Sequence, residues 1–280
     1  MRFVKYQGLG NDFILIADIL ADDSPPYRQR LARQLCDRHF GIGADGLLFV
    51  DPARSTAAVA TMHVVNADGS EPEMCGNGLR CVALHLAERP EHLAASRLLI
   101  DTPAGPRECL VDRLGDGLAR VTVDMGVATL TGEHLPSTTT PWLEQPVADG
   151  SLSGSAVNVG NPHLVIFSET EPQQLLAAHG ATLELHPRFR QRTNVEFVRQ
   201  SGPSQFEVAV WERGCGPTLA CGSGACAVAY AAVRLGRLAA DTPATVQLPG
   251  GALAITVDGK SDRVLMEGPA ERVFSGSVEI

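Results

Sequence analysis

Two cysteines of the 280-residue chain begin closely similar runs of sequence. Cys75 opens Cys-Gly-Asn-Gly-Leu-Arg-Cys-Val-Ala-Leu, and Cys221 opens Cys-Gly-Ser-Gly-Ala-Cys-Ala-Val-Ala-Tyr. In both, a glycine-containing loop passes into an apolar run, which is typical of a helix start. The amides of a first helical turn have no partner within the helix and carry partial positive charge. We therefore expect either thiolate to be stabilised and its pKa to be lowered.

Two such thiols are suited to moving a proton on and off a carbon atom. Inverting an α-carbon requires a base on one face and an acid on the other, since one side chain cannot easily reach both. The ordinary cysteine pKa of about 8.5 lets one thiol be ionised while the other is protonated. The glycines let backbone amides approach a ligand, so the helix starts could hold a carboxylate and stabilise a carbanion. A single such loop would fit a phosphate cradle, a redox thiol or a nucleophile equally well.

The two cysteine motifs belong to a repeat that covers most of the chain. In each half the cysteine stands nine residues after a polar residue that ends an apolar, strand-like run. The matched landmarks, at offsets drifting from 150 to 146 residues, are Gly10 and Gly160, Gly46 and Asn194, Asn66 and Glu212, and Cys75 and Cys221. Turn-forming Gly and Asn could produce one such match, but not four in the same order. Duplication predicts a pseudo-two-fold arrangement with the two motifs facing each other.

Local patterns predict the elements that position these motifs. The two cysteine loops predict helices over 75–88 and 221–235. The second is apolar on every side, so it should be buried. Exposed helices are predicted over 26–37 and 172–179. Alternating or apolar runs predict strands at 3–7, 13–18, 118–123, 205–212, 253–257 and 263–266. The Pro-, Thr- and Gly-rich stretch 129–155 reads as a loop.

Together these elements predict an α+β protein made of two pseudo-symmetric domains. Each would be a mixed, mostly antiparallel sheet or barrel wrapped around a central buried helix, with the active site in the cleft between the domains. The N-terminal lobe, with Cys75, would span 1–122 and be completed by 267–280. The C-terminal lobe, with Cys221, would span 123–266.

Bulk composition narrows the function classes. The net charge is −9 and the cationic residues are almost all scattered arginines, so a polyanion such as nucleic acid is not expected as a partner. No run resembles a signal peptide or a membrane span, which favours a cytoplasmic protein. The only lysines are Lys5, in a predicted strand, and Lys260, in a predicted turn. Neither suits a pyridoxal phosphate anchor, so a mechanism without cofactor is favoured.

The remaining cysteines and histidines carry less signal. An odd set of seven cysteines without Cys-x-x-Cys predicts free thiols and no metal site. Cys36, Cys81, Cys109 and Cys226 read as core thiols. The histidines read as surface or satisfied core residues, except His163, which follows the Gly160 landmark. Asp45 and Asp68, next to glycines, read as turn formers.

Two long stretches are similar to the signature stretches of diaminopimelate epimerases. They are Asn66-Ala-Asp-Gly-Ser-Glu-Pro-Glu-Met-Cys-Gly-Asn-Gly-Leu-Arg-Cys and Glu212-Arg-Gly-Cys-Gly-Pro-Thr-Leu-Ala-Cys-Gly-Ser-Gly-Ala-Cys-Ala. Shorter matches are Gly8-Leu-Gly-Asn-Asp-Phe, Gly41-Ile-Gly-Ala-Asp-Gly, Gly160-Asn-Pro-His and Arg192-Thr-Asn-Val-Glu-Phe. The chain thus resembles this family from its N-terminus to past Cys226.

The resemblance implies a homodimeric enzyme that interconverts LL-2,6-diaminopimelate and the meso form, on the route to lysine and peptidoglycan. It implies Cys75 and Cys221 as the two acid–base residues. The residues it implies at the reacting carboxylate are Gly76, Asn77, Gly222 and Ser223. Those it implies around the distant carboxylate and ammonium are Asn11, Asn66, Asn161, Asn194, Arg213 and Glu212. It further implies that His163 and Glu212 adjust the cysteine pKa values.

Two departures affect the details. Gly46 stands where some family members have a substrate-contacting glutamine, so it receives no role. Cys215-Gly-Pro-Thr replaces a stretch that often has Glu before Thr, which adds a thiol close in sequence to Cys221.

Other functions remain to be compared. A proline racemase or a phenazine-pathway isomerase would use a related fold, but the adjacent Glu212 and Arg213 argue against both. A thiol redox protein would normally keep its cysteine pair close in sequence, and a binding module would not need two activated thiols. Alkylation with substrate protection would separate these classes.

Overall fold

The computed structural model describes residues 1–18, 22–72 and 74–279. The chain forms two compact units: unit 1 is Met1–Val123 with Gly268–Ile280, and unit 2 is Asp124–Glu267. The boundaries expected from the sequence, after residues 122 and 266, each lie one residue earlier. Strands β7 and β16 contain the boundaries, so each contributes to both units.

Unit 1 is a mixed sheet. Its strands are β1 (Arg2–Gly8), β2 (Asn11–Ile16), β3 (Gly46–Asp51), β4 (Ala60–Asn66), β5 (Arg97–Asp101), β6 (Arg107–Gly115), β7 (Leu118–Val127) and the C-terminal part of β16 (Arg263–Ser277). They lie in chain order, and β1 also pairs with β16. Parallel neighbours need a crossover, and here helices α1 (Pro25–Leu35) and α2 (Gly76–Ala87) lie between β2 and β3 and between β4 and β5. A short 3₁₀ turn, Pro90–His92, follows α2.

The strands and helices of unit 2 have the same kind of connectivity. Its strands are β8 (Gln145–Val147), β9 (Leu152–Asn158), β10 (Pro162–Phe167), β11 (Asn194–Gly202), β12 (Gln205–Glu212), β13 (Gly216–Thr218), β14 (Ala244–Leu248), β15 (Gly251–Val257) and the first part of β16. The parallel pairs are β10–β11 and β12–β14, and helices α3 (Pro172–Glu184) and α4 (Gly222–Arg234) form their crossovers. Another 3₁₀ turn, Ala148–Gly150, precedes β9.

The register shows that the sequence repeat is also a structural repeat. In unit 1, Phe13 on β2 lies opposite Gly46 on the parallel strand β3. In unit 2, the matched residues His163 and Asn194 lie opposite each other on β10 and β11. The α+β class and the two similarly wired halves predicted from the sequence are confirmed.

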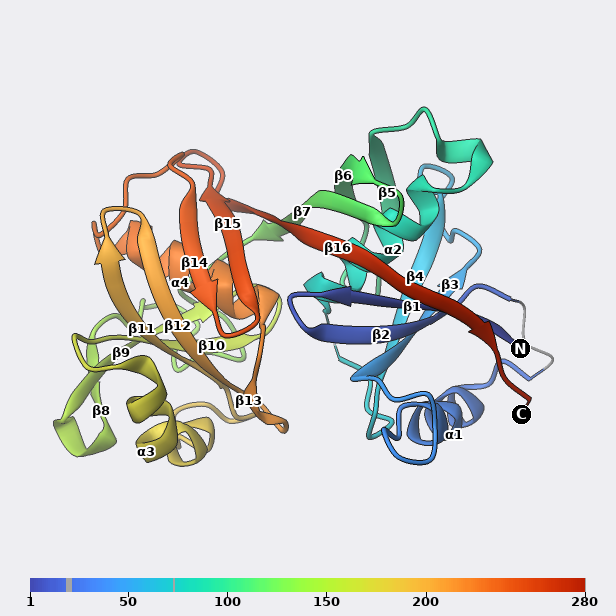
Figure 1. Ribbon diagram of the computed structural model, residues 1–280. Helices are drawn as coiled ribbons and strands as arrows, with labels where there is room; N and C mark the ends of the chain where they lie inside the picture. The colour runs from blue at the N-terminus through green and yellow to red at the C-terminus, as the bar shows by residue number, and fades with distance from the viewer. Residues whose placement is uncertain (19–21, 73, 280) are drawn as a thin grey trace. The chain divides into compact units, whose positions relative to one another are not determined.

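Each unit has one helix inside its sheet and one outside (Figure 1). In unit 1, α2 contacts β1 to β6, and every residue of this helix except His85 is buried. In unit 2, α4 contacts β9, β10, β11, β14 and β15, and only its ends and Ser223 reach solvent. Small and apolar side chains let the strands close around both helices. The cysteine that precedes each helix is therefore held against a rigid core.

The outer helices pack on separate hydrophobic clusters. Leu31, Ala32 and Leu35 of α1 join a cluster with β2 and β3 residues, and Leu175, Leu176 and Leu183 of α3 join another with β10 and β11 residues. Both helices had been predicted, although α3 extends five residues further. Among the described residues, no helix is long and apolar enough to cross a membrane.

The prediction of a loop over 129–155 is partly wrong. Strand β8 and the first residues of β9 lie within it, and they pair antiparallel through Gln145–Gly154 and Val147–Leu152. Pro and Gly punctuate this hairpin without preventing its short ladder, because Pro146 stands on β8 at the end of the sheet order.

Candidate active site

Cys75 and Cys221 are the N-cap residues of α2 and α4. Both have extended backbone angles, φ −138° and ψ 93° for Cys75 and φ −122° and ψ 108° for Cys221. Each Sγ accepts a hydrogen bond from the amide three residues later, Gly78 or Gly224, at 3.3 Å in both cases. The predicted helix starts are thus confirmed, and one first-turn amide in each helix points at sulfur.

The two thiols differ in exposure. Cys75 is partly exposed, whereas Cys221 is 4% exposed. Burial raises the pKa of Cys221 well above its ordinary value, and the nearby Glu212 and Glu196 raise it further. Hydrogen bonds from Ser223 and Gly224 lower this pKa but do not outweigh those effects. The expectation of a lowered pKa is therefore wrong for Cys221 in the ligand-free protein, where desolvation exceeds the helix-start effect.

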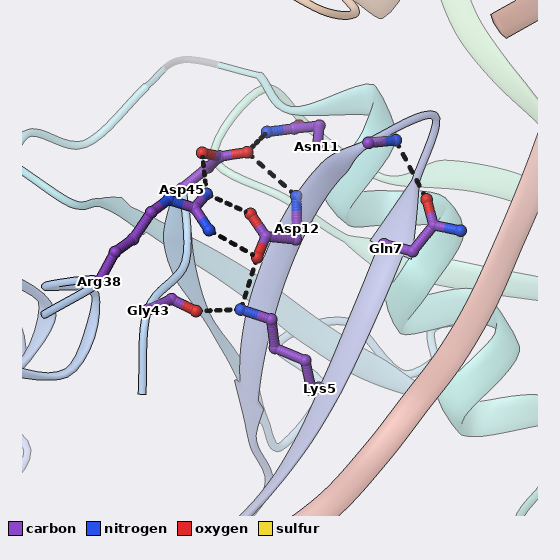
Figure 2. A network of polar contacts seen from close by, with 8 residues as sticks. Lys5, Gln7, Asn11, Asp12, Arg38, Gly43 and Asp45 are labelled. Atoms are coloured by element: carbon purple, nitrogen blue, oxygen red, sulfur yellow. Dashed lines mark hydrogen bonds and ion pairs between the residues drawn. The ribbon is translucent and has the colours of Figure 1, made fainter. Parts of the chain in front are cut away.

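The start of α2 is held by a polar network on β1, β2 and the segment before β3 (Figure 2). Asp45 lies at its centre. One carboxylate oxygen accepts from Asn11 Nδ2 at 2.7 Å and from the Asp12 amide at 3.0 Å, and the other meets Arg38 at 2.8 Å. Asp12 in turn binds Arg38 and the buried Lys5, both at 2.6 Å. Although burial raises the pKa of Asp12, hydrogen bonds from Arg38 and Lys5 lower it below its usual range.

This network determines which way the Asn11 amide points. The Asp45 carboxylate only accepts hydrogen bonds, so Asn11 must present its NH₂ group to it. Asn11 Oδ1 then faces α2, where it accepts from Asn77 Nδ2 at 3.1 Å. Asp45, predicted to be only a turn former, orients two residues implied in ligand binding. Its position next to Gly46 gave no sign of this role.

The start of α4 is held differently, by a buried histidine and acid. His163 Nδ1 lies 2.7 Å from Glu196 Oε1, and His163 Nε2 lies 2.9 Å from Asn161 Oδ1. Asn161 Nδ2 donates to Ser223 Oγ at 3.4 Å, and Ser223 Oγ lies 3.6 Å from Cys221 Sγ. Sequence analysis did not single out Glu196. An acid within the apolar run Asn-Val-Glu-Phe-Val was the signal that could have identified it.

Glu212, at the end of β12, completes the surroundings of Cys221. It accepts a hydrogen bond from Thr218 on β13. Burial raises the pKa of Glu212, and this effect exceeds the lowering by the hydrogen bond from Thr218. The charge of Glu196 raises the pKa further, and His163 and Cys221 lower it to a smaller extent. The contact with Cys221 agrees with the implied influence of Glu212 on the thiol.

Three implied binding residues lie at or next to strand ends: at the end of β4, at the start of β11 and after β12. Asn66 ends β4, and its Nδ2 donates to Ser70 Oγ at 3.0 Å within the turn. In unit 2, Asn194 Oδ1 accepts from the Arg213 amide at 3.0 Å, and Asn194 Nδ2 donates to the Pro162 carbonyl at 2.9 Å. Unit 1 thus brings Asn11, Gly76 and Asn77 together around Cys75, while unit 2 gathers Asn161, His163, Glu212, Gly222 and Ser223 around Cys221 and joins Asn194 to Arg213. Among the described contacts, Asn66 is tied only to its own turn.

The described geometry has the parts that proton transfer next to a carboxylate requires. Each helix start offers a thiol, first-turn amides and one polar side chain, Asn77 or Ser223. Such a helix start binds anions, and a thiol beside it can give or take a proton.

Comparison with known proteins agrees with this chemistry. A family model described as diaminopimelate epimerase matches residues 3–131 and 155–273. The chain is similar to a diaminopimelate epimerase from Synechocystis sp., with 45% identity over 286 residues that cover 100% of this chain and 99% of the relative. A diaminopimelate epimerase from Cyanothece sp. is 46% identical over 284 residues, covering 99% of each chain.

Solved structures share the fold at lower identity. A hydroxyproline epimerase from Agrobacterium vitis matches with a TM-score of 0.73 and 15% identity, covering 99% of this chain and 90% of that one. A PhzF-family phenazine biosynthesis protein from Bacillus anthracis matches with a TM-score of 0.71 and 16% identity, covering 100% and 99%. The fold is thus common to several isomerases, and the sequence match is what separates them.

Proposed function

This chain belongs to the diaminopimelate epimerase family, and on that premise we propose that Cys75 and Cys221 are the two acid–base residues with which it interconverts LL- and meso-2,6-diaminopimelate. The observation that carries this proposal is the shared N-cap geometry, in which each sulfur accepts a first-turn amide at 3.3 Å. One cysteine thiolate removes the α-proton from one face of the substrate. The thiol of the other returns a proton to the opposite face.

In this proposal first-turn amides of α2 and α4 bind the carboxylate at the reacting carbon and stabilise negative charge as the proton leaves. Gly76, Asn77, Gly222 and Ser223 supply these contacts. Asn11 and Asn161 orient Asn77 and Ser223 through the hydrogen bonds described above. Ligand-free Cys221 is the thiol, because burial and two carboxylates raise its pKa.

The far end of the substrate carries a second carboxylate and ammonium. We assign the carboxylate to Asn66, Asn194 and Arg213, since arginine can bind it with two hydrogen bonds, and the ammonium to Glu212. A site that pairs both ends rejects amino acids lacking the second one, because its buried polar groups would be left unpaired. We further propose that the enzyme acts as a cytoplasmic homodimer without a cofactor.

The test is to incubate the reduced protein with LL-diaminopimelate in heavy water and to follow the α-proton signal by NMR. The expected result is loss of that signal as the meso isomer forms, without added pyridoxal phosphate or metal. Absence of exchange from a folded protein with titratable thiols would contradict the substrate assignment. Proline and hydroxyproline would then be tested.

A further inference from the structure

Glu196 is a buried acid whose surroundings show no structural need for a charge. Its side chain and that of His163 are both 0% exposed and meet at 2.7 Å across the parallel strands β10 and β11. The second carboxylate oxygen, Oε2, is buried and has no hydrogen-bond partner among the described residues. In unit 1 the matched position is Leu48, which is fully buried without any polar contact to satisfy. A costly buried charge where a leucine suffices indicates a functional role.

The acid lies directly behind the first turn of α4. A Cβ atom placed on Gly224 would be 2.8 Å from Glu196 Oε1 and 3.3 Å from Cys221 Sγ. The titratable groups that face Glu196 are His163 on β10, Glu212 on β12 and Cys221 at the start of α4. The Glu196 carboxylate is therefore close enough to influence the Cys221 thiol electrostatically from behind the first turn of α4.

A chain of hydrogen bonds links Glu196 to the start of α4. An ionised carboxylate only accepts, so His163 Nδ1 carries a proton and donates to it. His163 Nε2 lies 2.9 Å from Asn161 Oδ1, and Asn161 Nδ2 is turned toward Ser223 Oγ. With its oxygen accepting from Asn161, Ser223 keeps its own hydroxyl proton for Cys221 or for a ligand.

We propose that Glu196 is a positioning residue for the epimerase reaction, which through His163 orients Asn161 and Ser223 at the first turn of α4. The inference rests on the proposed function, since it concerns the half-site that contains Cys221. The negative charge of Glu196 is also one cause of the raised pKa of Cys221, after burial and Glu212. Loss of that charge should therefore make this thiol more reactive.

The central experiment compares Glu196→Gln with Glu196→Asp in the full-length protein. Gln keeps the shape but loses the charge, whereas Asp keeps the charge but withdraws it from His163. Iodoacetamide labelling of each cysteine at pH 8 is measured by mass spectrometry. We expect Cys221 to react about tenfold faster in Glu196→Gln, because removal of a nearby negative charge favours the thiolate, and to keep its wild-type rate in Glu196→Asp. Cys75, in the other unit, is the internal control.

The kinetic readout separates positioning from charge. We expect kcat for LL-diaminopimelate to fall about tenfold in both variants, because both disturb the His163–Asn161–Ser223 chain. Glu207→Gln is the matched control, since Glu207 lies on β12 and pairs with Arg199 at the surface. Cys221 labelling and kcat both within twofold of wild type in Glu196→Gln would overturn the proposal.

A measurement on the wild-type protein covers the case in which the variants fold poorly. In protein labelled with ¹⁵N-histidine, the His163 signals are identified by their loss in His163→Gln. Nδ1 should carry a proton and show the hydrogen bond to Glu196, and a ring without a proton on Nδ1 would overturn the proposed orientation. If the wild-type protein does not exchange the substrate proton, the proposed function fails, while the labelling and NMR results still test the role of Glu196 separately.

Discussion

The first turns of α2 and α4 have a similar backbone conformation but pack against different side chains. A Cβ atom on Gly78 would meet Leu48 at 2.8 Å and Cys75 Sγ at 3.1 Å, whereas one on Gly224 would meet Glu196 and Cys221. Unit 1 thus has an apolar side chain against the helix start where unit 2 has a carboxylate. The same substitution pattern continues at Phe13, which matches His163 across the repeat.

Charged residues are present in unit 1 as well. Lys5, Asp12, Arg38 and Asp45 form a network with Asn11 (Figure 2). Asn11 links this network to Asn77 on α2. In unit 2, Glu196 and Glu212 act on Cys221 directly. One scaffold therefore holds two thiols with different electrostatic surroundings. In a two-base reaction one thiol is ionised while the other holds a proton, and the carboxylates near Cys221 favour its protonated form.

The largest expected effect comes from removing either thiol. If the two halves contribute one base each, Cys75→Ala and Cys221→Ala should each lower kcat for epimerisation by at least about 10³-fold, as expected for losing an essential proton-transfer group. The measurement is the NMR assay for the meso isomer. Cys215→Ala, at an exposed thiol near Cys221 in sequence, is the control and should stay within twofold. A loss of this size in only one of the variants Cys75→Ala and Cys221→Ala would contradict the proposal that each unit contributes one base.

A smaller effect is expected from the network of unit 1. Asp45→Asn removes the charge that holds Arg38 and leaves the Asn11 amide free to turn, so Asn77 loses its partner. We expect kcat/KM for LL-diaminopimelate to fall about tenfold, equivalent to about 1.4 kcal/mol, the size of one charge-assisted hydrogen bond. Asp18→Asn, at the exposed partner of Arg2, is the control. Unchanged kinetics in Asp45→Asn would show that the network serves folding only.

The smallest effect concerns acid stability. His85 on α2 has its pKa lowered to about 4, first by burial and then by Arg89 and Arg272, and the matched position on α4 is Ala231. Folded His85 stays neutral, so its contribution to stability is complete above the ordinary value of 6.5 and is lost as pH falls toward 4. Because of His85, we expect the free energy of unfolding to fall by about 1 kcal/mol as the pH is lowered from 7 to 5.5.

The check is urea unfolding of wild type and His85→Gln at both pH values. The variant cannot take up a proton at this position, so its stability should fall by about 1 kcal/mol less than that of the wild-type protein. An equal fall in both proteins would mean that His85 is not the residue that titrates.

Much of the fold was accessible from the sequence. The two central helices lie within a residue of their predicted bounds, because a glycine-containing loop and a run of small apolar residues leave few alternatives. The hairpin of β8 and β9 could not be predicted from the sequence, because its pairing depends on partner residues rather than on local composition. Asp45 and Glu196 were missed because their partners, Asn11 and His163, lie 34 and 33 residues away along the chain.

By itself, the sequence determined the duplication, the two cysteine N-caps and the chemistry of paired proton transfer, because all of these depend on residue types and their spacing along the chain. Only the tertiary structure decided that Cys221 is enclosed by two carboxylates and a histidine, whereas a leucine occupies the place of Glu196 in the half that contains Cys75. The physical reason is that desolvation and Coulomb interactions depend on distances through space. Strand register, not neighbouring residues, sets the distances from Glu196 and Glu212 and thereby raises the pKa of Cys221.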